Sequence, residues 1–175
     1  MTDAVSSRDS LPVLETHDVV SLVSDSGVIR YRITSPLWLV YDRLDPSMWA
    51  FEKGVYLESF DSLDHVEASV EADTAYYYDK KSLWELRGNV QIKNMEGEEF
   101  SSDQMFWNQE TQKIYSDRHI RILQKDRVIT GRGFESNQQM TVYTIRYPEG
   151  IFYVDNEQAQ AQNPDSLSTS SEQMP

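Results

Sequence analysis

The chain has 175 residues, of which 39% are hydrophobic and 26% charged, and it carries a formal net charge of −13 and no cysteine. This length can bury one sizeable core, and the acidic balance argues against nucleic-acid binding, because phosphate contacts need clustered Lys and Arg. Without cysteine, disulfide frameworks, thiolate metal sites and cysteine nucleophiles are excluded.

The two ends of the chain differ from its middle in composition. Polar residues dominate the first ten positions, and residues 157–175 contain almost nothing to bury. We therefore predict a polar N-terminal segment at residues 1–18 and a disordered tail at residues 157–175. Residues 19–156 are predicted to form a single domain. Its longest apolar run, at residues 37–41, is far shorter than the roughly 18 residues that span a bilayer.

Alternating apolar and polar residues predict β-strands through this domain. The alternation is clearest at residues 83–92 and 114–122. The apolar faces of these two stretches contain Trp84, Leu86, Val90, Ile92, Ile114, Ile120 and Ile122. Turn signals separate the predicted strands at residues 25–27, 44–46, 94–97 and 147–150. Since no apolar stripe at helical spacing exceeds about two turns, we predict an all-β fold.

A short unit recurs along the chain at intervals of 30 and 29 residues. Its three copies begin at Val70, Phe100 and Ile129, and a fainter copy begins at Ile33. The third position of each copy is small and the sixth is apolar; these residues are Ala72, Ser102 and Gly131, then Ala75, Met105 and Phe134. One such unit cannot bury an apolar face alone, whereas stacked units can.

The spacing inside the unit predicts a β-bulge. The first and sixth positions are five residues apart, so strict alternation would place them on opposite faces of a strand. If both point inward, a bulge lies between them, beside Asp73 or Asp103. We interpret these aspartates as acceptors for backbone N–H groups that lose their partners at the bulge.

Residues 100–119 contain serine, aspartate and histidine, which are the components of a hydrolytic triad. A catalytic interpretation of Ser102, Asp103 and His119 is disfavoured, because no G-x-S-x-G turn is present and the other copies of the unit carry Ala72 and Gly131 in place of the serine. We predict no catalytic residue.

Metal, glycosidase and phosphate sites find equally little support. The three histidines show no H-x-H or H-x₃-H spacing, so no metal site is predicted. Asp73, Glu85 and Asp103 could supply a carboxylate pair, but among 29 acidic residues any such pair is uninformative. No glycine-rich phosphate loop occurs, and no cofactor is predicted.

The inward-facing aromatic residues leave two interpretations open. They can fill the closed core of a structural or carbohydrate-binding β-sandwich, or they can line an open sandwich that holds an apolar ligand. The residues concerned are Tyr77, Trp84, Phe100, Trp107 and Phe134.

The chain contains the stretch VEADTAYYYDKKSLWELRGNVQIKNMEGEEFSSDQMFWNQETQKIYSD, followed by VITGRGFESN. These stretches resemble the LptC family of lipopolysaccharide-export proteins. That family shares its repeat with LptA/OstA-like periplasmic proteins. The matching elements are small-Asp-x-Ala/Met-x-aromatic, L-x-G-x-V-x-I, T-Q-x-x-x-S-D, and a glycine-containing turn into Phe134 and Asn137. Their order and spacing carry the resemblance, which covers roughly residues 27–154.

The resemblance implies an open β-jellyroll, with a slot between two antiparallel sheets. It also implies a non-catalytic role in the periplasm of a Gram-negative bacterium, where acyl chains of lipopolysaccharide pass from an inner-membrane ABC transporter to an LptA-like bridge protein. Family members usually carry an N-terminal membrane helix. This chain shows none, so we expect its anchor to have been removed from the sequence given.

The resemblance and the strand pattern together predict the site residues. The slot is expected to be lined by Tyr77, Trp84, Leu86, Val90, Ile92, Phe100, Met105, Trp107, Ile114, Ile120, Ile122 and Phe134. The C-terminal sheet edge is expected to receive the bridge protein by strand addition, through Gly150, Ile151, Phe152, Tyr153 and Val154. The N-terminal edge is expected to face the transporter. Given the net charge, we expect the lipid headgroup to travel outside the slot, in solvent.

Overall fold

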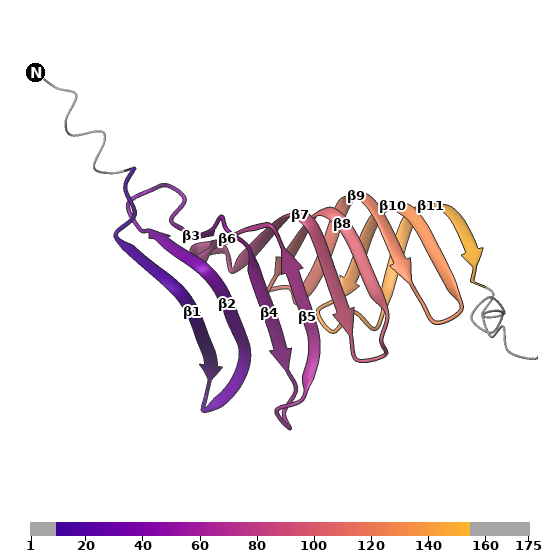
Figure 1. Cartoon of the computed structure of the whole chain (residues 1–175), viewed down its shortest axis with the longest axis horizontal. Helices are drawn as coiled ribbons and strands as arrows, with labels where there is room; N and C mark the ends of the chain where they lie inside the picture. Colours follow the sequence, from indigo (N-terminus) through magenta and orange to yellow (C-terminus); the bar gives the residue numbers. More distant parts are fainter. Residues whose placement is uncertain (1–9, 155–175) are drawn as a thin grey trace, which may run out of the picture.

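The structure, a computed structural model, describes residues 10–154, and within them it contains strands and one short 3-10 helix (Figure 1). The strands are β1 (Leu14–Asp25), β2 (Val28–Tyr41), β3 (Met48–Phe51), β4 (Val55–Phe60), β5 (Val66–Ala72), β6 (Thr74–Tyr78), β7 (Leu83–Asn94), β8 (Glu99–Asn108), β9 (Lys113–Leu123), β10 (Arg127–Asn137) and β11 (Tyr143–Tyr153), and the helix is η1 (Asp79–Lys81). The all-β prediction is confirmed. Strand β1 begins inside the segment predicted as a polar N-terminus, and the predicted tail lies outside the described residues.

One continuous antiparallel sheet forms both layers of the fold. Strand β7 pairs with β6 through its first half and with β5 through its second half. Strand β2 is divided in the same way between β4 and β3. We call the layer that contains β3 and β6 the β6 wall, and the layer that contains β4 and β5 the β5 wall. Strands β8 to β11 continue both walls toward the C-terminal end (Figure 1). This is the two-layered jellyroll that the resemblance implies.

The long strands pass from one wall to the other at bulges, as the spacing within the repeat predicts. The register of β7 against β8 shifts between Arg87 and Val90, where Gly88 and Asn89 both have positive φ. The register of β8 against β9 shifts between Ser102 and Phe106. These shifts allow the first and sixth residues of a copy to face the same interior.

Serine hydroxyls fill the opened hydrogen-bond ladder at the bulge of β8 and β9. Ser102 donates from Oγ to the backbone carbonyl of His119 over 2.8 Å. Ser116 donates from Oγ to the carbonyl of Gln104 over 2.6 Å. Both serines are buried on the inner face, where the ladder is open.

The role predicted for the aspartates is therefore wrong. Asp103 is exposed on the outer side of β8. The Asp73 carboxylate accepts a hydrogen bond from the side-chain amide of Asn89 over 2.8 Å, rather than from a backbone N–H. The alternation of the strand explains the error, because the residue after an inward-facing small residue points outward, away from the open ladder.

Three of the four predicted turns lie between strands, and one prediction is wrong. Residues 25–27, 44–46 and 94–97 connect β1 to β2, β2 to β3 and β7 to β8. Residues 147–150 instead lie inside β11, where the register against β10 shifts so that Pro148 faces Gly131. A Cβ at Gly131 would lie 2.8 Å from the carbonyl oxygen of Tyr147, so the glycine permits the close approach of the two strands. The proline and glycine of this segment mark a bulge.

Candidate functional site

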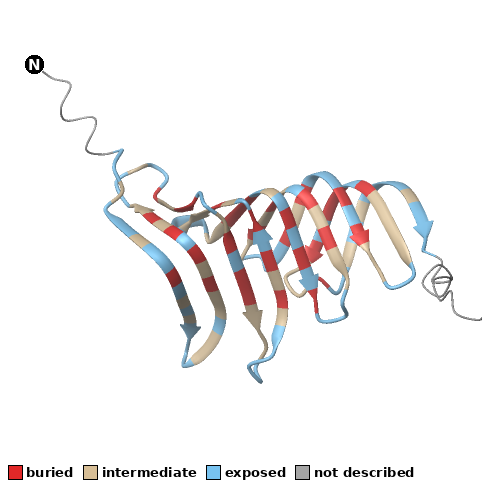
Figure 2. Ribbon diagram, in the orientation of Figure 1, coloured by how far each residue is buried: buried red, intermediate tan, exposed pale blue. Residues whose placement is uncertain are grey.

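A continuous apolar row runs across the inner face of the β5 wall, from β2 to the edge strand β11. Its members are successive cross-strand partners: Ile33, Leu57, Val70, Ile92, Phe100, Ile122, Ile129 and Ile151. Directly paired residues share one face of a sheet, so the row forms a band along the long axis of the molecule. Figure 2 shows the buried segments of the strands that make this band.

The facing row on the β6 wall changes character along its length. It consists of Trp49, Tyr77, Trp84, Trp107, Ile114, Ser136 and Tyr143. We call its first four members the aromatic ladder. The ring centroids of Trp49 and Tyr77 lie 4.8 Å apart, and those of Tyr77 and Trp84 lie 4.9 Å apart. Tilted rings in mutual contact therefore line the slot at one end, and smaller or polar side chains line it at the other.

The twelve predicted slot residues lie together between the walls. Eleven of them are buried in one apolar cluster, and the twelfth, Tyr77, packs against it. The walls touch across the slot, with ring centroids of Phe100 and Phe134 5.7 Å apart and those of Tyr31 and Trp107 5.9 Å apart. Between them a hollow of only about 10 Å³ remains, beside Trp107 and Ile114. The slot is closed by its own side chains in this state.

The same cluster contains residues that the sequence did not assign to the slot. These are Ile33, Phe51, Val55, Leu57, Val70, Ala72, Ala75 and Met140. Ile33 and Val70 begin copies of the repeat, and that signal could have identified them. Met140 stands in a polar turn between β10 and β11, where no periodicity predicts burial.

A hollow of about 500 Å³ lies at the free ends of the two walls, and we call it the mouth hollow. Tyr31 and Phe60 come from the β5 wall, and Trp107 with the glutamines Gln109 and Gln112 comes from the β6 wall. Burial raises the pKa of the Tyr31 hydroxyl above its ordinary value. Trp107 lines both the mouth hollow and the small apolar hollow beneath it, so the mouth hollow leads to the aromatic ladder.

Farther along the slot, polar groups join the free ends of the walls, and we call these groups the clasp. The side-chain amide of Asn94 donates to the carbonyl oxygen of Met140 over 2.9 Å. The Tyr143 hydroxyl donates to a Glu98 carboxylate oxygen over 2.7 Å. The Gln124 amide donates to both the Tyr143 hydroxyl and Glu98, over 2.6 and 2.8 Å. The clasp therefore connects the β7–β8 and β9–β10 turns of one wall to the β10–β11 turn and β11 of the other.

Charge and burial keep the clasp in its bonded form. Burial alone would raise the pKa of Glu98, but the hydrogen bonds from Tyr143, Asn94 and Gln124 lower that pKa below its ordinary value. Burial, with a smaller contribution from the neighbouring Glu98 carboxylate, raises the pKa of Tyr143 to about 12. Around neutral pH the clasp thus pairs a neutral phenol donor with an ionised carboxylate acceptor.

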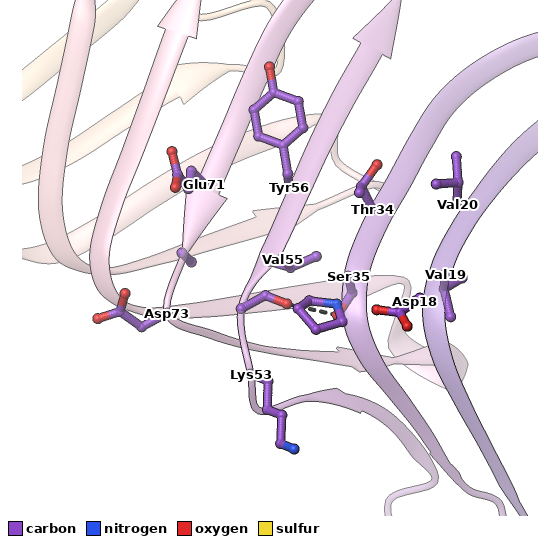
Figure 3. A pocket seen from close by; sticks show the side chains of 13 residues that line it. Asp18, Val19, Val20, Thr34, Ser35, Lys53, Val55, Tyr56, Glu71 and Asp73 are labelled. Atoms are coloured by element: carbon purple, nitrogen blue, oxygen red, sulfur yellow. Dashed lines mark hydrogen bonds between the residues drawn. The ribbon is translucent and has the colours of Figure 1, made fainter.

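A larger hollow, of about 770 Å³, lies at the bend where β2 leaves β4 for β3. Figure 3 shows Asp18, Glu71 and Asp73 around it, with Lys53 as the single basic side chain. Ser35 closes its floor by donating a hydrogen bond to the carbonyl oxygen of Gly54 over 2.7 Å. Three carboxylates and one lysine give this hollow an acidic lining.

Two free sheet edges lie at opposite ends of the molecule (Figure 1). Within residues 10–154, strand β11 pairs with β10 alone, and β1 pairs with β2 alone. At the predicted partner edge, the apolar residues Ile151 to Val154 are exposed by 47–72%. Strand β1 also exposes Val20 and Leu22, which the sequence did not single out. Exposed apolar edge strands are suited to strand addition.

The three residues of the disfavoured triad line one hollow of about 230 Å³, but the partners found there are not those of a triad. The Ser102 hydroxyl is engaged with the backbone of His119, and the His119 ring lies 3.2 Å from the carboxylate of Glu149. Within residues 10–154, no group of three or more acidic or histidine side chains is placed to hold a metal ion. The same residues contain no helix with the length and apolar character needed to cross a membrane.

Comparison with known protein families gives a match over most of the chain. The sequence model of the family described as "LptC: Lipopolysaccharide-assembly, LptC-related" matches residues 5–146. The matched span contains β1 to β10 and the beginning of β11, and so includes both walls, the mouth hollow and the clasp. Among curated proteins, none matches the chain.

Proposed function

The chain belongs to the LptC-related family of lipopolysaccharide-assembly proteins, and we propose that it is a non-catalytic carrier of lipid acyl chains. In this proposal the two walls hold the acyl chains of lipopolysaccharide between them, while the headgroup stays in solvent. The observation that carries it is the pair of facing rows, of which the β5-wall row is apolar from β2 to the edge strand β11.

The energetics of acyl transfer suit such rows. Each CH₂ group exposed to water costs about 0.8 kcal/mol, so one long acyl chain costs on the order of 10 kcal/mol. Contacts with Leu57, Ile92 and Ile122 remove that cost without directional bonds, and the chain can therefore slide from one member of the row to the next. No chemical step is needed.

The closed state of the slot sets the condition for binding. The walls are joined by backbone at the bulges, and the clasp joins their free ends toward β11. Around the aromatic ladder, the described parts of the two walls are held together by apolar contacts such as that between Tyr31 and Trp107. Both of these residues line the mouth hollow. We place acyl entry there, because lipid contacts can replace the wall-to-wall apolar contacts at little cost.

In this proposal the partner proteins bind at the two free edges of the sheet. An LptA-like bridge protein adds a strand to β11 at residues 150–154, so that its slot continues the apolar row beyond Ile151. The β1 edge, with its exposed Val20 and Leu22, faces the inner-membrane transporter subunits. The protein works in the periplasm, tethered to the inner membrane.

Site-specific photo-crosslinking tests the carrier role. A photoreactive residue at Trp107 or Ile120, both on the inner face, should capture lipopolysaccharide in cells. Arg121 is the matched control, because it neighbours Ile120 on the same strand and is exposed on the outer face. Capture from Arg121 alone would contradict a path between the walls.

A closed structural or carbohydrate-binding β-sandwich is the second candidate function. The close contact of the walls favours it, since the apolar hollow between them is only about 10 Å³. This function predicts that a fluorescent fatty-acid probe does not bind at any concentration below its micellar limit. Saturable binding of the probe, displaced by lipopolysaccharide, would exclude it.

A further inference from the structure

Three indole N–H groups inside the fold have no hydrogen-bond partner. They belong to Trp38, Trp84 and Trp107, and within residues 10–154 they are the buried side-chain polar atoms left unpaired. A buried donor without an acceptor carries a free-energy cost, and native proteins retain few such groups. Three of them in one slot therefore require a physical explanation.

The three donors lie along the same wall. Trp84 and Trp107 are direct cross-strand partners in the aromatic ladder. The ring of Phe51 connects them to Trp38, with centroids 5.5 Å from Trp38 and 5.5 Å from Trp84. The unpaired N–H groups thus follow the slot from β2 to β8, along the path of the proposed acyl chain.

The row of side chains directly opposite offers them no acceptor, although Ser59 of the β5 wall and Gln138 line the small hollow beside Trp107. The facing row consists of aliphatic side chains and one phenylalanine, none of which carries a polar atom. The backbone groups of the strands are engaged in the sheet ladders. An unsubstituted hydrocarbon chain in the slot would also leave the indoles unpaired, because it carries no acceptor oxygen.

We propose that the indole N–H groups of Trp107 and Trp84, with Trp38 beyond them, form a recognition subsite for the oxygen atoms of acyl chains. The acceptors are the carbonyl oxygen of an ester or amide linkage, or a hydroxyl on the chain. The slot then binds oxygen-bearing acyl chains in preference to plain alkyl chains. The alkyl part lies along the β5-wall row, and its oxygen faces the ladder.

Trp107 is the first of the three donors that an entering chain meets. Its ring lines the mouth hollow, whereas Trp84 is fully buried one strand farther in. The amides of Gln109 and Gln112 line the mouth with donors and acceptors for polar groups near the linkage, beside the charged side chains of Asp25, Arg30, Asp61 and Glu67. A chain that enters through the mouth therefore exchanges the polar lining of the hollow for the indole donors as it moves inward.

The inference rests on the proposed carrier function and adds a selectivity to it. A matched pair of probes tests the selectivity: a long-chain fatty acid and its β-hydroxylated counterpart, each displacing a fluorescent fatty acid from the protein. Net hydrogen bonds of ordinary strength predict that wild-type protein binds the hydroxylated acid roughly 2- to 10-fold more tightly.

Tryptophan-to-phenylalanine variants identify the donor, because they keep a ring and remove the N–H. Trp107→Phe and the double variant with Trp84→Phe should weaken binding of the hydroxylated acid more than binding of the plain acid, and so lose the preference. Trp49→Phe is the matched control, since Trp49 belongs to the same ladder and its N–H is not among the unpaired donors. It should retain the preference.

A measurement on unaltered protein covers the case in which a variant folds poorly. The indole ¹⁵N–¹H resonances of Trp84 and Trp107 should shift downfield with the hydroxylated acid more than with the plain acid. Equal affinities for the two acids in wild type, or an undiminished preference in the double variant, would overturn the selectivity and leave the carrier role intact. If neither acid displaces the fluorescent probe, the carrier role itself fails.

Discussion

The two ends of the slot are built from the same repeat but are closed in different ways. At the ladder end, Trp49, Tyr77, Trp84 and Trp107 line the β6 wall. The indole N–H groups of Trp84 and Trp107 are unpaired, and the mouth hollow reaches the Trp107 ring. At the clasp end, Ile114, Ser136 and Tyr143 take the equivalent positions, and polar groups join the free ends of the walls. The clasp members, unlike the indoles, are paired with one another.

This difference indicates that the repeat determines the two rows of side chains, whereas the turns between the strands determine whether a ligand can reach those rows. The β5-wall row keeps its apolar character through both ends. The turn that contains Met140 folds inward, with Met140 fully buried and its carbonyl oxygen bonded to the side-chain amide of Asn94. We interpret the ladder end as the place where a chain is taken up and the clasp end as the gate before the β11 edge.

Removal of a ring at the clasp end should produce the largest effect. Phe100 packs against Phe134 and Tyr143, with centroids 5.7 and 5.2 Å away. We expect Phe100→Ala to lower the free energy of unfolding by about 3–5 kcal/mol, because it leaves a cavity in the closed end. Urea denaturation measures the loss. Ile151→Ala, in the same row but exposed at the edge, should change stability by no more than about 0.5 kcal/mol.

Disruption of the clasp should affect the clasp end of the slot and leave the ladder end unchanged. Asn94 is buried, and its side-chain amide donates a hydrogen bond to the Met140 carbonyl oxygen and accepts one from the backbone N–H of Glu98. Asn94→Ala should cost about 1–3 kcal/mol and should accelerate hydrogen exchange in residues 138–142. Exchange in residues 109–112, at the ladder end, is the internal control. Equal acceleration in both segments would show that the two ends are not closed independently.

The bulge hydroxyl offers a smaller test of the same comparison. The repeat carries Ala72 where the later copy carries Ser102, whose hydroxyl bonds to the strand β9 backbone. Ser102→Ala gives the later copy the chemistry of the earlier one. We expect a loss of about 1 kcal/mol in thermal or urea unfolding, against nearly none for its outward-facing neighbour in Ser101→Ala. If Ser102→Ala left the free energy of unfolding unchanged, the hydroxyl would have no stabilising role.

The smallest effect is the pH dependence of the clasp. Because the folded pKa of Glu98 lies below its ordinary value, its contribution to stability is present above that ordinary value, near 4.5, and is lost as the pH falls through the folded pKa. The folded pKa of Tyr143, about 12, exceeds its ordinary value of 10.0, so its contribution is present below pH 10 and is lost as the pH rises toward 12.

A pH series of unfolding curves tests this dependence. Glu98→Gln should flatten the acid limb of the stability profile and leave the alkaline limb in place. Hydrogen exchange in residues 138–142 should follow the same acid limb, because the clasp holds that turn. If the acid limb were identical in wild type and Glu98→Gln, Glu98 would not contribute to the stability of the clasp.

The sequence predicts the rows well and the closure poorly, for physical reasons. Alternation and the five-residue spacing of Phe100 and Met105 predict the inward faces and their bulges, since a strand has a fixed period of two. The clasp joins Asn94 to Met140 across distant turns, and burial of Met140 depends on a contact that no local pattern encodes. The unpaired indoles are equally invisible, because a missing acceptor is a property of the opposite wall.

Distances across the two ends test the central claim most directly. The chain has no cysteine, so spin labels can be placed at Ser62 and Gln112, on opposite sides of the mouth hollow, and at Glu96 and Thr141, across the clasp. When lipopolysaccharide is added, we predict that the distance between Ser62 and Gln112 increases, while the distance between Glu96 and Thr141 changes less. Saturable lipid binding with both distances unchanged would contradict the entry of acyl chains between the walls.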